Sequence, residues 1–327
     1  MSTSRAEPGI AWDQHGCLPL RPDETAIDQL DLYLDSGVSF VSINVGMDST
    51  SPLDARKILA AFSRGVRTRP DRFVLAHTAN DVRSAQLEGQ LAVAFDLEGT
   101  EPLDGDVAMV GAFYALGVRT MLIAYNSRNR AGGGCHDQAD TGLTAFGRAV
   151  VQEMNRVGMV VDATHCSRRT TLDLFEVSTE PVIFSHSVPG AIKKHPRNID
   201  DVQMRACAAT GGVIGINGVG IFLGDNDAST EALVKAVDYA VQLVGPRHVG
   251  IGLDYVFDRA ELRSFVAAQG TFPAGFGYRE NDELAFASPS QIASIQTRLD
   301  ELGYDASSVD AILGGNFLRI ADRVWRG

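Results

Sequence analysis

The chain has 327 residues, of which 45% are hydrophobic and 21% charged, and its formal net charge is −12. The apolar fraction is sufficient for a large core. The negative charge argues against nucleic acid and anionic membranes as partners, because both would repel the protein. The amino terminus has no apolar segment behind a basic one, and no apolar run approaches the length of a membrane-spanning helix. Four cysteines in so long a chain do not form a disulfide scaffold, so we expect a cytoplasmic protein.

Short apolar runs rich in β-branched residues alternate with segments of helical periodicity along the chain, which is typical of βα units. Eight strands are predicted, over Ile10–His15, Val38–Val45, Leu91–Glu98, Val118–Tyr125, Met159–His165, Pro181–His186, Gly212–Asn217 and His248–Val256. A ninth run, Arg72–His77, is expected to form an extra strand outside this set.

Helices are predicted between the strands from their capping residues. Thr144, Asp200, Ser229 and Ser288 each precede a segment with a helical apolar stripe, and Gly158 ends the first of these helices. Nearly every strand is apolar on both faces, which indicates a parallel sheet covered by helices. Eight such units favour closure into a (β/α)₈ TIM barrel, and the lack of a linker or repeat predicts one domain over residues 1–327.

Polar side chains stand at the carboxyl ends of six of these strands, where the active sites of barrels lie. They are His15 (with Cys17 two residues on), Glu98, Tyr125, His165, His186 and Asp254. Each ends an alternating set of inward-facing residues, and a buried polar group is costly unless it is paired or bound to a metal. Their convergence on one mouth therefore predicts a functional site.

Imidazole and carboxylate ligands suit zinc and its neighbours in the first transition row. Glu98 is the natural bridge between two ions, leaving His15 with Cys17 for one ion and His165 with His186 for the other. Such ions lower the pKa of a bound water from about 15.7 to about 7. Asp254, a carboxylate at the same mouth, is placed for general acid–base work.

Several segments resemble the membrane dipeptidase (renal dipeptidase) family of zinc peptidases, peptidase family M19, whose bacterial members are soluble. The matching segments are WDQH (12–15), FDLEG (95–99), LTAFGRAVVQEMNRVGMVVDATHCS (143–167), VIFSHS (182–187), PRNIDD (196–201), VGIGLD (249–254) and LGGNFLRI (313–320). They run along most of the chain, and together they are far more specific than any single motif.

The resemblance implies a metal-dependent hydrolase with two zinc ions, bridged by Glu98 and held also by His15, His165 and His186. It implies that Arg197 grips the terminal carboxylate of a dipeptide and that Asp254 passes a proton from the attacking water to the leaving amine. The family tolerates a D-residue at the carboxyl-terminal position, so L-D dipeptides are candidate substrates. Family precedent also suggests a homodimer.

The sequence departs from the family pattern at two positions. Cys17 stands where the family has an aspartate on the first strand, and it is either a thiolate ligand or a small buried hydrophobe; one ion instead of two is possible for this reason. Tyr125 stands where the mammalian enzymes carry a histidine that polarises the scissile carbonyl. A phenol can donate to the developing oxyanion, so Tyr125 is expected in catalysis and substrate binding, although it could be a core aromatic.

Other polar residues near the predicted site are expected to play supporting parts. Asp96 lies one layer below Glu98 and is expected to support a ligand. Arg197 could instead pair with Asp200 or Asp201. Four further histidines are expected away from the converging set as structural or exposed residues, namely His77, His136, His195 and His248. Of these, His136 is singled out because it lies in the glycine-rich segment that overhangs the mouth.

Two segments are expected near the mouth of the barrel. The glycine-rich segment Asn126–Thr144 follows a strand, so it is a candidate lid or specificity wall. The segment Arg259–Ala287 has little periodicity, and its aromatic residues either line the pocket or pack on a second subunit.

The leading hypothesis is a zinc dipeptidase. A second hypothesis is a metal-dependent amidase or lactonase acting on a non-peptide metabolite, which retained metal without dipeptide turnover would favour. A third is a non-catalytic homologue whose first metal site has decayed at Cys17, which a stable fold without zinc would favour.

Overall fold

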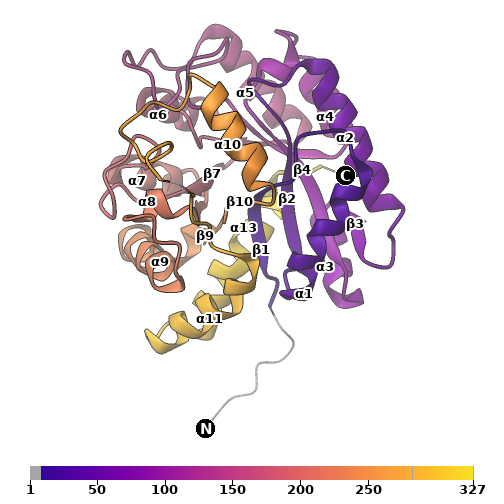
Figure 1. The fold of residues 1–327 in the computed structure, drawn as a ribbon, viewed down its shortest axis with the longest axis vertical. Helices are drawn as coiled ribbons and strands as arrows, with labels where there is room; N and C mark the ends of the chain where they lie inside the picture. The colour runs from indigo at the N-terminus through magenta and orange to yellow at the C-terminus, as the bar shows by residue number, and fades with distance from the viewer. Residues whose placement is uncertain (1–8, 282, 327) are drawn as a thin grey trace.

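The computed structural model describes residues 9–281 and 283–326 and contains a ten-stranded sheet of parallel strands surrounded by helices (Figure 1). The amino-terminal residues 1–8, where no secretory signal was expected, lie outside the described residues. The strands are β1 (Trp12–Cys17), β2 (Phe40–Met47), β3 (Phe73–Leu75), β4 (Leu91–Glu98), β5 (Val118–Leu122), β6 (Val160–Asp162), β7 (Val182–Ser187), β8 (Ile214–Ile216), β9 (Val249–Ile251) and β10 (Tyr255–Val256).

The sheet returns on itself and confirms the (β/α)₈-barrel fold class. Its order is β10-β1-β2-β4-β5-β6-β7-β8-β9. The two strands at the ends of this order, β9 and β10, follow each other directly in the chain. Gly252 N donates to Ile216 O at 3.1 Å, and Asp254 N donates to His15 O at 3.0 Å. The predicted strand His248–Val256 is therefore divided into β9 and β10, because Asp254 has a left-handed backbone (φ 57°) that an extended strand cannot contain.

The extra strand predicted over Arg72–His77 is present as β3, which pairs only with β4 and lies off the main path of the sheet. β5, β6 and β8 are also shorter than predicted. β5 ends at Leu122 and β6 at Asp162, so Tyr125 and His165 stand in the loops that follow these strands. The backbone of His165 is also left-handed, with φ 64°.

Thirteen α-helices are assigned among the described residues. They are α1 (Asp31–Asp35), α2 (Pro52–Arg67), α3 (Ala79–Glu88), α4 (Met109–Ala115), α5 (Ala145–Val157), α6 (Arg168–Val177), α7 (Asp201–Ala209), α8 (Gly220–Leu223), α9 (Thr230–Val244), α10 (Arg259–Ala268), α11 (Ile292–Glu301), α12 (Ala306–Asp310) and α13 (Asn316–Val324). The predicted caps are confirmed: Thr144 and Ser229 accept hydrogen bonds from the first turns of α5 and α9, and Asp200 forms a capping box with Gln203. No helix among these residues has both the length and the apolar character needed to cross a membrane.

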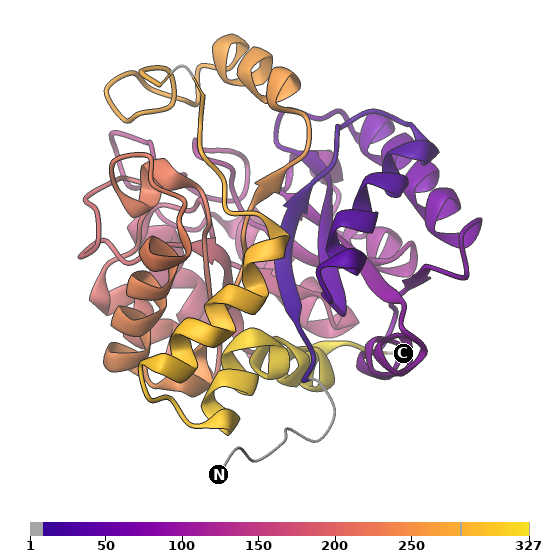
Figure 2. The same cartoon turned by 60° about the horizontal axis from the view of Figure 1, so that its bottom comes forward.

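The two ends of the barrel differ in chemistry. At the amino-terminal end, Trp12 stacks on Phe40 with ring centroids 3.7 Å apart and on Phe317 of α13 at 6.3 Å. The opposite end, where the strands finish, lies beneath α10 (Figure 2). The segment Arg259–Ala287 thus begins with a helix that the sequence analysis did not predict, although Asp258 caps it by accepting from Glu261 N at 2.9 Å.

Candidate metal centre

Three histidines converge on one carboxylate oxygen at the carboxyl-terminal end of the barrel. Oε1 of Glu98, the last residue of β4, lies 3.4 Å from His15 Nε2, 3.3 Å from His165 Nε2 and 3.4 Å from His186 Nε2. All four side chains are buried. The structure therefore brings together residues from four separate parts of the chain that the sequence analysis assigned to one site.

Cys17 joins this cluster from the end of β1. Its Sγ lies 3.4 Å from His15 Nε2 and 3.9 Å from Asp254 Oδ1. The ligand atoms of His15, Cys17 and Glu98 lie within 4.8 Å of one another, as do those of Glu98, His165 and His186. These two sets share Glu98, and the ligand atoms of a third set, His15, His186 and Asp254, meet the same distance limit.

A polar partner holds the other ring nitrogen of each histidine. His15 Nδ1 lies 3.3 Å from Asp96 Oδ2, and His165 Nδ1 lies 2.7 Å from Asn126 Oδ1. His186 Nδ1 lies 2.8 Å from the hydroxyl of Ser185. For His165 and His186, whose pKa values burial lowers, a proton on Nδ1 would leave the Nε2 lone pair facing the cluster, as in a metal-binding imidazole. Burial also acts to lower the pKa of His15, but the negative charges of Asp96 and Glu98 outweigh it and raise that pKa well above its usual value.

Neighbouring strand residues hold the two carboxylates of β4. Asn44 Nδ2 donates to Glu98 Oε2 at 2.6 Å, and Ser42 Oγ donates to Asp96 Oδ2 at 2.6 Å. The sequence analysis missed both donors. The sequence does contain a pattern that could have identified them, because Ser42 and Asn44 are polar residues at alternating positions of an otherwise apolar strand.

The electrostatics of the cluster suit a bound cation. Burial lowers the pKa values of His165 and His186 well below their usual range, so both imidazoles are neutral, which is the form that binds metal. Burial raises the pKa of Glu98 to about 8 and that of Cys17 to about 12. Divalent ions held by these side chains would oppose both shifts, because a cation favours the carboxylate and the thiolate. This donor set fits two borderline divalent ions such as zinc.

Asp254 lies beside the cluster on the turn between β9 and β10. Its Oδ1 is 3.8 Å from His15 Nε2, and its Oδ2 accepts a hydrogen bond from Asn217 Nδ2 at 2.9 Å. Burial raises the pKa of Asp254 above its usual value. Its left-handed backbone is costly for a non-glycine residue, and such strain concentrates at functional sites.

Arg197 is nearly inaccessible, with 3% of its surface exposed. Its Nη2 donates to the carbonyl of His186 at 3.2 Å, and its Nε has no hydrogen-bond partner among the described residues. It pairs with neither Asp200 nor Asp201: Asp200 is bound by Arg168, and Asp201 accepts from Tyr239. Its buried guanidinium therefore retains donor capacity for a ligand.

His136 and His195 lie outside the histidine–carboxylate cluster, but both are near Arg197. Arg197 N donates to His195 Nδ1 at 3.0 Å, and the His136 ring lies 6.3 Å from the His195 ring. His77 and His248 do lie apart, against Arg119 and the carbonyl of Gly212.

Tyr125 packs flat against a histidine of the cluster, with its ring centroid 4.2 Å from that of His165. Its backbone N–H donates to Asp48 Oδ2 at 2.8 Å, which fixes the start of the loop. Burial raises the pKa of Tyr125 well above its usual value, so the phenol keeps its proton and can donate a hydrogen bond.

The glycine-rich segment Asn126–Thr144 supports the site from beside it. Cys135 N donates to the carbonyl of His165 at 2.8 Å, and Ser167 N donates to the carbonyl of Gly133 at 2.9 Å. These bonds explain how the chain holds His165 in its left-handed conformation. The segment is thus attached to the His165 loop by backbone hydrogen bonds, and Asn126 is its one residue in the lining of the cavity described below.

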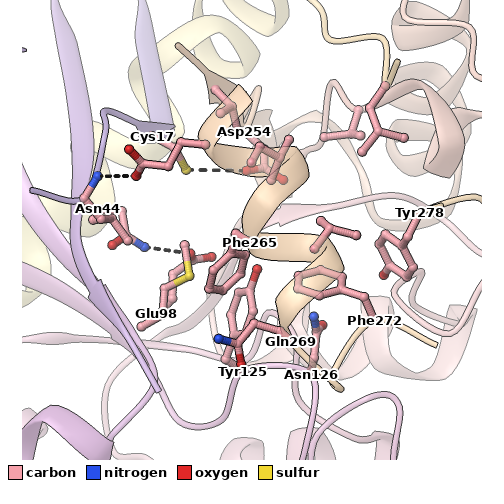
Figure 3. Close-up of a pocket in the computed structure, with 18 of the residues that line it drawn as sticks. Cys17, Asn44, Glu98, Tyr125, Asn126, Asp254, Phe265, Gln269, Phe272 and Tyr278 are labelled. Carbon is pink, nitrogen blue, oxygen red and sulfur yellow. Dashed lines mark hydrogen bonds between the residues drawn. The ribbon is translucent and has the colours of Figure 1, made fainter. Parts of the chain in front are cut away.

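A cavity of about 360 Å³ opens above the cluster. Glu98, Tyr125 and Asp254 line its polar floor, whereas Phe265, Phe272 and Tyr278 from the Arg259–Ala287 segment line its far wall (Figure 3). The aromatic residues of that segment therefore line the pocket, one of the two alternatives that the sequence left open.

Comparison with known proteins agrees with this geometry. The sequence profile of the membrane dipeptidase family (peptidase family M19) matches residues 34–263. An uncharacterised protein in the pqqA 5′ region of Klebsiella pneumoniae is 29% identical over 82% of this chain and 95% of its own length. Dipeptidase verJ of Clonostachys rogersoniana is 33% identical over 78% of this chain, which spans 61% of that protein.

Among solved structures, an amidohydrolase from Pseudomonas aeruginosa superposes with a TM-score of 0.87 at 24% identity, covering 97% of both chains. That likeness establishes a shared fold. Since the family profile matches residues 34–263, well over half of the chain, the chain belongs to the membrane dipeptidase family, peptidase family M19, and is a hydrolase of the metallo-dipeptidase class.

Proposed function

We propose that this protein hydrolyses the peptide bond of small dipeptides, L-D dipeptides among them, with the help of two zinc ions. The observation that supports this most strongly is the convergence of three imidazoles on the buried carboxylate of Glu98, beneath a cavity that also contains Arg197 and Asp254. When bound, the ions supply a water of lowered pKa and polarise the substrate carbonyl.

The side chains of the cluster form two metal-binding positions in this proposal. His15 and Cys17 would hold one ion, His165 and His186 would hold the other, and Glu98 would contribute to both. The fixed Nδ1 contacts of the three histidines support these roles, because they orient the rings before an ion arrives.

Arg197 binds the carboxylate of the carboxyl-terminal residue of the substrate. A planar guanidinium can make two parallel hydrogen bonds to a carboxylate, and this one is buried next to the His186 ligand. Burial strengthens the attraction between the two charges, because little water competes for them.

Asp254 accepts a proton from the attacking water and returns it to the leaving amine. Its distance from His15 and its raised pKa support this role, because a carboxylate of higher pKa is a better proton donor in the second step. Tyr125 donates a hydrogen bond to the oxygen of the scissile carbonyl as negative charge develops there.

The experiment that tests the proposal is hydrolysis of a panel of L-L and L-D dipeptides by protein purified without chelator, with zinc added back. Release of both amino acids by the zinc-loaded protein, and loss of activity on chelation, is the expected result. Failure to cleave any dipeptide at full zinc occupancy would contradict the proposal and favour an amidase or lactonase acting on a non-peptide metabolite.

A further inference from the structure

The half of the cavity on the side away from Arg197 has a largely apolar lining, and Phe222 adds apolar surface on the Arg197 side. Arg197 follows β7, and in the order of the sheet β7 and β2 lie halfway around the barrel from each other. The loops after β1 and β2 contribute Leu18, Leu20 and Met47 to the cavity, and α10 contributes Leu262 and Phe265 from above. The metal cluster and Asp254 lie between this apolar half and Arg197.

The charged residues at the rim of the apolar half are already engaged. Glu261 accepts hydrogen bonds from Leu20 N at 2.8 Å and from Arg21 Nη1 at 2.9 Å. Asp258 caps α10 and lies 3.6 Å from Arg21 Nη1. Their main contacts are therefore with the protein itself. The leucines, Met47 and Phe265 make up most of the remaining surface, which also includes the uncharged polar side chains of Ser49, Thr50 and Gln269.

We propose that this apolar half binds a bulky hydrophobic side chain, aromatic or branched aliphatic, on the acyl side of the scissile amide. The inference rests on the proposed function: with the substrate carboxylate on Arg197 and the amide over Glu98, the amino-terminal residue extends toward β1, β2 and α10. A cavity of about 360 Å³ falls in the usual range for small-ligand sites, roughly 300–1,000 Å³. The preferred substrates are therefore dipeptides such as Phe-Ala and Leu-Ala.

Substrate preference tests the proposal directly. The zinc-loaded enzyme is assayed with Gly-Ala, Ala-Ala, Leu-Ala and Phe-Ala, which differ only in the amino-terminal residue. Burial of the larger side chain is expected to raise kcat/KM for Leu-Ala and Phe-Ala by roughly 10- to 100-fold over Gly-Ala. Equal or better cleavage of Gly-Ala would overturn the proposal while leaving the dipeptidase activity intact.

Variants on α10 test whether the preference for a bulky amino-terminal residue depends on the side chains of this helix that line the cavity. Phe265→Ala and Leu262→Ala are each expected to lower kcat/KM for Phe-Ala by about 10-fold, with Gly-Ala changed much less. Arg263→Ala is the matched control, because Arg263 is exposed on the same helix and does not line the cavity. Circular dichroism and thermal unfolding identify any variant that fails to fold, and the two alanine variants give independent readings. An unchanged preference in both folded variants would contradict the proposal.

A binding measurement tests the apolar site independently of the proposed dipeptidase activity. Phosphinate mimics of Phe-Ala and Ala-Ala, which the enzyme cannot hydrolyse, are titrated calorimetrically into the zinc-loaded protein. Tighter binding of the Phe-Ala mimic by roughly 10-fold or more is expected, even if turnover of dipeptides were to fail. Equal affinities would overturn the apolar site.

Discussion

The carboxylate of Asp13 accepts a hydrogen bond from the backbone N–H of Leu253 at 2.8 Å, across 240 residues of sequence. The same oxygen lies 3.3 Å from His15 N, and the other oxygen accepts from the hydroxyl of Tyr33 at 3.0 Å. One buried side chain on β1 therefore holds both the histidine of the metal cluster and the turn that carries Asp254.

Asp13→Ala is expected to lower the free energy of unfolding by about 2–4 kcal/mol, because it leaves buried backbone donors unpaired. Asp13→Asn is expected to retain most of the stability, since its amide oxygen still accepts from both N–H groups. Tyr33→Phe is the control that leaves the Leu253 contact intact. Chemical denaturation measures all three, and equal losses in Asp13→Asn and Asp13→Ala would show that the charge matters more than the hydrogen bonds.

Arg197→Met is expected to lower kcat/KM for dipeptides by roughly 30- to 1,000-fold, mainly through KM, because a buried charge pair with the substrate is lost. Dipeptide amides, which lack the carboxylate, should be cleaved equally by the variant and the parent. Arg168→Ala, which removes an exposed arginine paired with Asp200, is the control. A loss of the same size on the amides would argue against a carboxylate partner.

Asp254→Asn is expected to reduce kcat by roughly 10²- to 10⁴-fold, with the metal content of the chain unchanged. Asn217→Ala removes only the hydrogen bond to Asp254 and is expected to cost about 10-fold. Steady-state kinetics together with elemental analysis check the pair. Loss of an ion from Asp254→Asn would make Asp254 a ligand and not a proton carrier.

Stability is expected to fall on acidification through the histidines beside Arg197. Burial lowers the pKa of His195 to about 4 and that of His136 to about 3, below the ordinary value of 6.5. Between about pH 4 and 6.5 the unfolded chain binds protons that the folded chain does not, so the free energy of unfolding rises with pH over this window. His195→Gln should flatten this dependence in thermal unfolding scans. Parallel pH profiles for the parent and the variant would refute the assignment.

The sequence predicted the barrel and most of the cluster because Glu98 and His186 end long apolar runs of clear period. It did not predict that β6 ends early or that β9 and β10 are separate strands. The reason is that His165 and Asp254 adopt left-handed backbones, a conformation that is uncommon even for histidine and aspartate, in which it is more frequent than in most other residues.

Contacts between segments that are distant in the chain could also not be predicted from the sequence. The approach of His195 to the Arg197 site depends on how the loop after β7 folds back, and the Asp13–Leu253 bond depends on closure of the barrel. Helix α10 was different, since Asp258 and Glu261 form an acidic start that could have been read as a capping signal.

The metal content of the parent and of Cys17→Ala, determined by elemental analysis after purification without chelator, tests the central claim most directly. In the proposed centre the first ion depends on the thiol of Cys17, at the position where the family resemblance leads us to expect an aspartate. The account predicts about two zinc ions per chain for the parent and about one for Cys17→Ala, because the site formed by Glu98, His165 and His186 remains complete. One ion or none in the parent, or the same content in both proteins, would contradict a two-ion centre that uses Cys17 as a ligand.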